Sequence, residues 1–339
     1  MRIVDQKVFY FSLIAIFIII GILFLNVFIL AARPASQNEN WQEFEVKPGW
    51  GMKEIGQTLK EGNLITSLLR FKFYTVLTGR ALSLKPGNYL FSPSMTLGEI
   101  VKKLWQGPQE EVAVTIPEGF SLKDIDRLLS GAGIIISGKL YAFSPNELAQ
   151  EFSFLSGARS LEGYLFPDTY RFFRNSGAKV AAQKMIKNFQ LKVLPFIESS
   201  QSDLRKIVIL ASLIEKEVIL DSDRYLVAGI LKKRLESDFP LQVDATVVYV
   251  KCKGEYQNCP TKELSKNDFH LDSPFNTYLY QGLPPSPIAN PGLSAIKAAL
   301  KPLVSKYWYY LSDPVTKKTI FSKSLEEHNF NRSKYLKIN

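Results

Sequence analysis

The sequence predicts an α+β protein that has an apolar N-terminal helix, a small α+β unit and a larger mixed α+β unit. Residues 9–30 form one uncharged apolar run. Segments 44–65 and 114–135 both read as a strand, a glycine turn and an amphipathic helix, offset by 70 residues. Helix-like and strand-like stretches then follow irregularly from about residue 137, which is typical of an α+β domain.

The apolar N-terminal segment predicts a single transmembrane helix. Residues 8–32 contain no charged side chain, and an uncharged helix of this length spans about 30 Å of hydrocarbon. A cleaved signal peptide is the alternative, although its apolar core is usually only about 7–15 residues long. Arg2 and Lys7 precede the segment, so we expect residues 1–7 in the cytoplasm and the rest of the chain outside it.

Charge and soft ligands narrow the classes of partner. The net charge of +10 suits an anionic partner such as a nucleic acid, an acidic lipid surface or a cell-wall polymer. No run of five Lys or Arg occurs, which argues against nucleic acid. Cys252 and Cys259, with His270 and His328, lack zinc-ligand spacing, so we expect no metal and no cofactor. The cysteines are either a free pair or a local disulfide in an oxidising compartment, and we expect no catalytic role for them.

The first unit follows a short polar stretch. Residues 33–43 read as a linker, and residues 44–136 read as one α+β subdomain that contains both repeats. Between the repeats lie a turn at 85–89 and a short helix near 97–104. The pattern resembles the LysM-type glycan-binding module. The alternative is a rigid spacer in which the repeats only pack against each other.

Residues 137–339 read as the second, larger unit. We expect a hairpin made by 308–311 and 319–321, and a strand at 245–250 that leads into the cysteine loop. The predicted helices are 144–152, 178–194, 202–218, 224–236, 294–300 and one that begins at 324.

One carboxyl group in this unit stands out. On a helical wheel of residues 204–218, Glu215 lies on an apolar stripe, whereas Glu217 lies on the polar side and is expected to be solvated. Aliphatic surroundings weaken hydration of a carboxylate and raise its pKa toward the range useful to a general acid at neutral pH. The alternative is a buried ion pair between Glu215 and an arginine such as Arg171 or Arg224.

Aromatic and polar side chains mix in three loops. Glu162, Tyr164, Asp168 and Tyr170 lie in the first loop, and the mixture suits a sugar site because aromatic rings stack on apolar sugar faces. An ordinary turn packed under a core explains the same residues. The other two loops cover residues 272–280 and 287–292, and they contain Asn276, Tyr278 and Asn290.

Five motifs in one order resemble the endolytic murein transglycosylases of the YceG-like family. They are EGYLFPDTY at 162–170, LASLIEKEV at 210–218, LQVDATVVY at 241–249, DSPFNTYLYQGLPPSPIANPG at 272–292 and FSKSLEEHN at 321–329. In that family the Glu of the LAS-x-x-EKE helix is catalytic, which corresponds to Glu215. The chain departs from the family pattern at Ala245, where a proline is usual, and in the loop that holds both cysteines.

The resemblance implies a lytic transglycosylase in residues 137–339. One Glu would protonate the β-1,4 bond between N-acetylmuramic acid and N-acetylglucosamine and then remove the C6 hydroxyl proton, leaving a 1,6-anhydro end. Membrane-bound peptidoglycan synthases are plausible partners of such an enzyme, and its catalytic domain would lie outside the cytoplasmic membrane. The candidates for glycan binding are Glu162, Tyr164, Asp168, Tyr170, Gln242, Asp244, Asn276, Tyr278 and Asn290.

Two other classes of function stay open at this point. A non-catalytic cell-wall anchor would use only the LysM-like region. A muramidase would use water and a pair of carboxylates in place of the internal hydroxyl.

Overall fold

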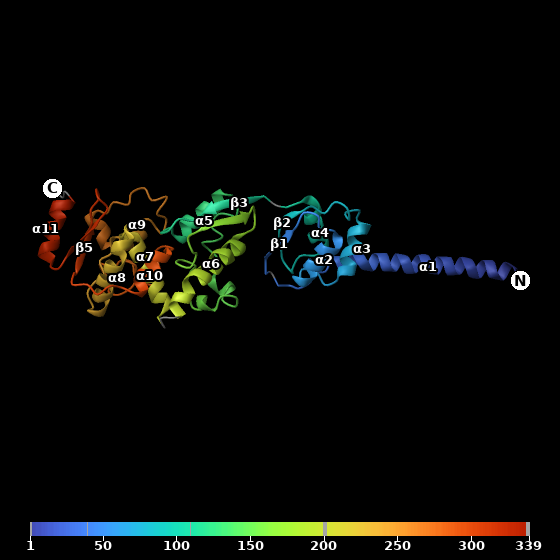
Figure 1. The fold of residues 1–339 in the computed structure, drawn as a ribbon, viewed down its shortest axis with the longest axis horizontal. Coiled ribbons are helices and arrows are strands. Elements are labelled where there is room, and N and C mark those ends of the chain that lie inside the picture. The colour runs from blue at the N-terminus through green and yellow to red at the C-terminus, as the bar shows by residue number, and fades with distance from the viewer. Residues whose placement is uncertain (1, 39, 109, 199–201, 337–339) are drawn as a thin grey trace. The chain divides into compact units, whose positions relative to one another are not determined.

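The protein is described here from a computed structural model, which covers residues 2–38, 40–108, 110–198 and 202–336 (Figure 1). The chain forms two compact units, Met1–Glu110 and Glu111–Asn339. This division lies before the boundary that we predict between residues 136 and 137. The mixed α+β class is confirmed.

The N-terminal helix α1 spans Arg2–Ala31. Its large apolar side chains that the structure describes are mostly exposed, from Phe11 to Ile29. Within the described residues, no helix meets the length and apolarity needed to cross a membrane. The predicted span 8–32 includes side chains at 8–10, 20, 23 and 24, which lie outside the described set, so this membrane segment stays a prediction.

The first unit has one two-stranded sheet. Its elements are β1 (Gln42–Val46), α2 (Met52–Glu61), α3 (Leu68–Leu77), β2 (Gly87–Phe91) and α4 (Leu97–Gln106). Strands β1 and β2 are antiparallel, with Phe44 opposite Tyr89. The turn after β1 places Gly49 at φ +86°, which favours glycine. The strand, turn and helix predicted for residues 44–65 are therefore confirmed.

Residues 34–38 do not form a free linker. Pro34 makes an antiparallel bridge with Thr96, and Ser36 N–H donates to Pro93 O at 2.9 Å. Ala31 is 2% exposed and belongs to the core cluster of the first unit. The polar composition predicts a linker, but these backbone bonds hold the segment against the loop that precedes α4.

The second unit contains the second repeat. Its first strand, β3 (Glu111–Thr115), pairs antiparallel with β4 (Thr169–Phe173), and its first helix is α5 (Leu122–Gly131). Because β3 pairs with a strand 54 residues later, from Thr115 to Thr169, the repeat belongs with the larger unit. The remaining elements are η1 (Pro145–Glu147), η2 (Ser153–Leu155), α6 (Ala178–Glu198), α7 (Leu204–Glu217), α8 (Asp221–Glu236), α9 (Asp244–Lys251), η3 (Lys266–His270), α10 (Leu293–Leu300), β5 (Tyr309–Ser312), β6 (Thr319–Ser322) and α11 (Leu325–Tyr335).

Most predicted elements of this unit are confirmed, including helices α6, α7, α8, α10 and α11 and the terminal hairpin of β5 and β6. The helix predicted at 144–152 is wrong. Only a short 3-10 turn forms at Pro145–Glu147, and Leu148 and Phe152 are buried in the core. Burial of these two side chains decides the local structure here, in place of helical periodicity.

The strand predicted at 245–250 is also wrong, because these residues form helix α9. Its β-branched residues favour a strand, but tertiary contacts override this weak preference. Thr246 Oγ1 donates to Val243 O at 2.7 Å and lies 3.0 Å from Thr277 Oγ1. The backbone N–H of Ala245, in the first turn, donates to the Glu217 carboxylate at 3.1 Å. A side-chain acceptor at this position stabilises the start of a helix.

Candidate active site

The last turn of α7 carries the candidate acids. Asp203 caps the helix by accepting from the backbone N–H groups of Arg205 and Lys206. The middle of the helix, residues 208–214, is buried, and α7 packs against α8, α9 and α10. Glu215, Lys216 and Glu217 follow at its C-terminal end, where they face different neighbours.

Glu215 is held in a buried ion pair, which is the alternative that the sequence leaves open. Arg224 Nη2 lies 2.9 Å from Glu215 Oε1, and Arg224 Nη1 lies 3.4 Å from Oε2. Both side chains are only 6% exposed. Glu215 Oε2 also accepts from the backbone N–H of Gly292 at 2.9 Å. Burial raises the pKa of Glu215, and Arg224 is the strongest of the influences that oppose this rise.

A second carboxyl group lies beside this pair. Glu118 is exposed, and a Cβ placed on Gly292 would collide with its carboxylate. The negative charge of Glu118 contributes to raising the pKa of Glu215. Our sequence reasoning missed Glu118. The available signal was its place at the tip of the turn Ile116-Pro117-Glu118-Gly119, just before a capped helix.

Glu217 does not have the solvated position that the helical wheel predicts. It is half-buried, and its carboxylate accepts from Ala245 N–H at 3.1 Å and from the Tyr310 hydroxyl at 3.3 Å. Burial raises the pKa of Glu217 to about 7, and the nearby carboxylate of Asp244 adds to this rise. The wheel failed because α9 and β5 cover the side of α7 that appears polar in the sequence.

Several predicted binding residues gather near Glu217. Asp244 is exposed at the start of α9 and accepts a hydrogen bond from the hydroxyl of half-buried Tyr278. Gln242 is exposed, has a positive φ of 49°, and donates its backbone N–H to Thr277 O at 3.1 Å. The loops that carry these residues are thus joined through Thr277, close to the Glu217 carboxylate.

Asn276 and Asn290 lie in the interior, each 0% exposed. Asn276 Nδ2 donates to Phe269 O and Leu271 O. Asn290 Oδ1 accepts from Gly163 N–H and Leu165 N–H, while Nδ2 donates to Phe120 O and Glu162 Oε1. Both amides therefore hold loops together, and their contact with glycan stays a prediction.

Glu162 belongs to the same interior network. It is 4% exposed, and its Oε1 accepts from Leu122 N–H at 2.8 Å and from Asn290 Nδ2 at 3.0 Å. Burial raises the pKa of Glu162 to about 8. In this position Glu162 links the first turn of α5 to the loop of Asn290, and it does not face solvent.

Of the other predicted binding residues, Tyr164 and Tyr170 are buried in the core of the second unit, and Asp168 lies in an ion pair. Tyr164 is 4% exposed and packs against the ring of Phe189, with 5.5 Å between centroids. The Tyr170 hydroxyl donates to Phe166 O. Asp168 is partly exposed and pairs with Lys192 at 2.7 Å, which lowers its pKa. The described contacts of these residues are with Phe189, Phe166 and Lys192, and none of them is with Glu215 or Glu217.

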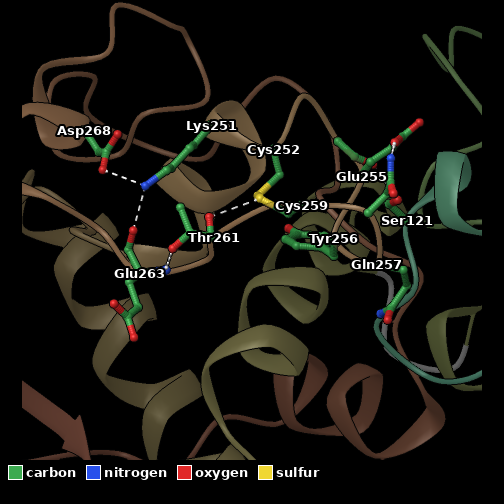
Figure 2. Close-up of a disulfide and its surroundings, with 12 residues drawn as sticks. Ser121, Lys251, Cys252, Glu255, Tyr256, Gln257, Cys259, Thr261, Glu263 and Asp268 are labelled. Atoms are coloured by element: carbon green, nitrogen blue, oxygen red, sulfur yellow. Dashed lines mark hydrogen bonds and ion pairs between the residues drawn. A yellow bond between two sulfur atoms is a disulfide. The ribbon is translucent and has the colours of Figure 1, made fainter.

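The cysteine loop contains a disulfide between Cys252 and Cys259 (Figure 2). The loop binds the start of α5. Ser121 Oγ donates to Gly254 O at 2.5 Å, and the Asp124 carboxylate accepts from the backbone N–H groups of Tyr256 and Gln257. This loop is therefore joined to the start of α5 by at least three hydrogen bonds. Among the described residues, no group of three potential ligands is arranged to hold a metal ion.

The last turn of α7 contains two carboxyl groups that differ in their hydrogen-bond partners. Glu215 has a cationic partner that favours its ionised form, whereas Glu217 accepts only from uncharged donors among the described residues. A carboxyl with a pKa near neutrality can donate a proton and later accept one. Asp244 and Tyr278 add exposed or half-exposed polar atoms at the same place.

Comparison with known proteins gives consistent matches. An endolytic murein transglycosylase of Streptococcus pneumoniae is 30% identical over 319 residues, which cover 86% of this chain and 58% of that protein. The chain thus spans little more than half the length of this relative. An endolytic murein transglycosylase of Bacillus subtilis is 29% identical, with coverage of 94% of this chain and 91% of the relative.

A solved structure and a family model complete the comparison. The crystal structure of a YceG-like protein from Listeria monocytogenes matches with a TM-score of 0.56 and 30% identity. The match covers 87% of this chain and 100% of the crystallised one. The model of the YceG-like family matches residues 44–334. The chain therefore belongs to the YceG-like family.

Proposed function

We propose that this protein is a membrane-anchored endolytic lytic transglycosylase that cleaves peptidoglycan glycan strands outside the cytoplasm. The bond cleaved is the β-1,4 bond between N-acetylmuramic acid and N-acetylglucosamine, and the product carries a 1,6-anhydro end. The observation that carries the proposal is the half-buried Glu217 carboxyl at the end of α7, which is held by Ala245 N–H and the Tyr310 hydroxyl. Burial raises the pKa of Glu217 to about 7, which suits both proton transfers. Membership of the YceG-like family and the names of the relatives support it.

In this mechanism Glu217 first donates its proton to the oxygen of the scissile bond. The leaving sugar departs, and positive charge develops on C1 of the muramic acid ring, as in other glycosidic cleavages. The exposed carboxylate of Asp244 lies near enough to Glu217 to influence its pKa and is suited to stabilise that charge. Glu217, now ionised, removes the proton of the C6 hydroxyl, which closes on C1. No water is consumed.

The choice of Glu217 over Glu215 rests on their partners. A general acid must be protonated near the working pH, and the bidentate Arg224 pair opposes protonation of Glu215. Glu215 then acts as an anchor that fixes the Gly292 N–H and thereby the loop before α10. Glu215 as the acid, which the family resemblance implies, is the second candidate, and the same experiment decides between them.

The remaining assignments belong to the same proposal. Residues 8–32 would anchor the protein in the cytoplasmic membrane, so that cleavage takes place on nascent strands close to membrane-bound synthases. The β1–α2–α3–β2 order of the first unit, with antiparallel strands, is compatible with a LysM-like glycan-binding role. Gln242, Asp244 and Tyr278 are the preferred candidates for glycan contact because each has exposed or half-exposed surface.

The test compares two variants from the same helical turn. Glu217→Gln keeps an acceptor for the Ala245 N–H but removes the transferable proton, so turnover of purified peptidoglycan should fall about 100- to 10,000-fold. Glu215→Gln should reduce stability, yet turnover per folded molecule should fall far less. The opposite ranking would assign the acid to Glu215.

Product masses test the reaction itself. Anhydro ends are lighter than reducing ends by one water, so wild-type digests should contain anhydro ends. A digest with reducing ends alone would identify a water-using muramidase. If well-folded wild-type protein leaves the peptidoglycan uncleaved, the non-catalytic anchor is favoured.

A further inference from the structure

The disulfide loop, residues 252–259, places an aromatic ring deep in the second unit. Tyr256 is 1% exposed, and its hydroxyl finds no hydrogen-bond partner within the described part of the chain. A buried tyrosine usually satisfies its hydroxyl. The ring, and not the hydroxyl, therefore accounts for the presence of Tyr256 at this position.

The ring of Tyr256 contacts the last turn of α7. Lys216 Nζ lies 3.8 Å from the ring centroid, and the same ammonium group donates to Gly119 O at 3.1 Å. A cation held over an aromatic face and bonded to a carbonyl has little freedom. Lys216 lies between Glu215 and Glu217 in the sequence, so its position fixes the turn that carries both carboxyl groups.

Gly119 lies between the last turn of α7 and the loop that contains Asn290. Its φ is +74°, and a Cβ at this position would lie 3.5 Å from Glu215 Cγ and 3.5 Å from Lys216 Cδ. Its N–H donates to Asn290 O at 2.9 Å. The Glu118–Gly119 turn is therefore fixed on one side by Lys216 and on the other by the Asn290 loop.

The loop itself is held in place at several points. The Asp124 carboxylate accepts from Tyr256 N–H and Gln257 N–H, and Arg127 pairs with Glu255 at 2.8 Å. Figure 2 shows Ser121, Tyr256 and Gln257 on the same side of the disulfide. Lys253 and Gly254 both have positive φ, at 51° and 75°. A residue with a side chain, such as Lys253, rarely adopts this left-handed conformation.

We propose that the loop closed by Cys252 and Cys259 is a positioning element for the active site, in which Tyr256 fixes Lys216 and Lys216 fixes the Glu118–Gly119 turn against α7. The disulfide restricts the alternatives open to the loop and keeps the ring in its place. Reduction of the disulfide releases the ring, loosens Lys216 and lowers the rate of cleavage. The enzyme is thus most active in an oxidising compartment. This inference rests on the proposed cleavage of glycan.

The test uses the full chain, with Tyr256→Phe and Tyr256→Leu as a matched pair. Tyr256→Phe keeps the ring and removes an unpartnered hydroxyl, so kcat on purified peptidoglycan should stay at the wild-type value. Tyr256→Leu removes the ring contact, and kcat should fall about 10-fold or more with KM little changed, because small displacements of reacting groups are costly. Wild type reduced with dithiothreitol and alkylated should show the same fall, and so should Cys252→Ser with Cys259→Ser.

Hydrogen exchange separates positioning from simple loss of stability. Amide exchange across residues 117–123 should become faster after reduction, while exchange in helix α6 stays unchanged at temperatures well below unfolding. Full kcat in both the reduced wild type and Tyr256→Leu would overturn the proposal, as would an unchanged exchange rate at 117–123. A wild-type enzyme that cleaves nothing while exchange still responds to reduction would refute the proposed function and leave the positioning role intact. If Tyr256→Leu fails to fold, the reduced wild type decides.

Discussion

Arg224 binds both carboxylate oxygens of Glu215, with nitrogen–oxygen distances of 2.9 and 3.4 Å, in a site where each side chain is 6% exposed. Glu217, two residues after Glu215, accepts hydrogen bonds from a backbone N–H group and a tyrosine hydroxyl. One turn of α7 thus presents a carboxylate stabilised by a cation and a carboxyl whose protonation is favoured by burial.

Replacing Arg224 by methionine should destabilise the second unit. The change leaves the Glu215 carboxylate buried and without its cation, which typically costs about 3–5 kcal/mol of unfolding free energy. Chemical denaturation at neutral pH measures the loss. The double variant Arg224→Met with Glu215→Gln should recover part of it, because no charge then stays buried. A loss well below 1 kcal/mol in the single variant would show that the pair is unimportant to folding.

The pH profile of kcat/KM should fall above about pH 7, because Glu217 must be protonated to act as the acid. Tyr310→Phe removes a donor that stabilises the Glu217 carboxylate, so the pKa rises and the fall moves to higher pH. Asp244→Asn removes a negative charge that raises this pKa, so the fall moves to lower pH. Arg234 is the second charge that influences the pKa of Glu217, and it lowers that pKa. Shifts of equal sign in the two variants would contradict this assignment.

Gly292→Ala should lower turnover with little effect on folding. Residue 292 has φ −75°, which alanine adopts without strain, but its Cβ would displace the exposed Glu118 side chain. Gly131→Ala is the control, because a Cβ there meets nothing within 4 Å. Steady-state turnover and thermal unfolding of both variants check this. Equal turnover in the two variants would indicate that the placement of Glu118 has no part in the reaction.

Glu162→Gln should change how stability depends on pH. Burial raises the pKa of Glu162 to about 8, so between its ordinary value and about 8 the folded protein holds a proton that the unfolded chain releases. The free energy of unfolding that this group contributes is therefore fully present below its ordinary pKa. It is lost progressively as pH rises, and the loss is complete once pH has passed about 8. Glutamine keeps the acceptor for Leu122 N–H. The variant should gain stability relative to wild type between pH 6 and pH 9, in melting experiments.

The control for Glu162→Gln is Glu236→Gln, at a side chain that is 65% exposed. Its melting temperature should follow that of wild type at every pH. A parallel pH dependence for Glu162→Gln and wild type would mean that Glu162 is ionised in the folded protein.

The predicted membrane anchor is tested by fractionation. Full-length protein should pellet with membranes and resist extraction at alkaline pH, and a chain without residues 1–26 should be released. The truncation is placed before Phe28, whose ring packs against Tyr74 at 5.5 Å, and before buried Ala31. Full-length protein in the soluble fraction would refute the predicted segment.

Five helices that the sequence predicts in the second unit are present, and two of them, α7 and α11, begin at the capping residues Asp203 and Ser324 that mark a helix start in the sequence. The prediction fails at residues 245–250, where the β-branched residues favour a strand and the Glu217 carboxylate supports a helix instead. That contact joins residues far apart in the chain, so no local pattern contains it. The helical wheel of α7 fails at Glu217 for the same reason, since α9 and β5 come from later in the sequence.

The candidate site was predicted in part. The motifs that contain Asp244 and Tyr278 do come together near the end of α7, since Ala245 N–H donates to Glu217 and the Tyr278 hydroxyl donates to Asp244. Burial separates Glu162, Tyr164, Tyr170, Asn276 and Asn290 from solvent, and burial depends on packing that residue type alone does not reveal. Asn290 illustrates this, since an amide between prolines looks like a ligand for sugar but is used to join three loops.

The backbone bonds of residues 34–38 give the first unit a fixed relation to α1. Pro34 bridges to Thr96, Ser36 donates to Pro93, and Ser92 donates to Asn38 O. A flexible tether would let the unit swivel and sample many heights. Here a displacement of the last turn of α1 is passed through residues 34–38 to the loop before α4. The end of the helix and the first unit are therefore expected to move together.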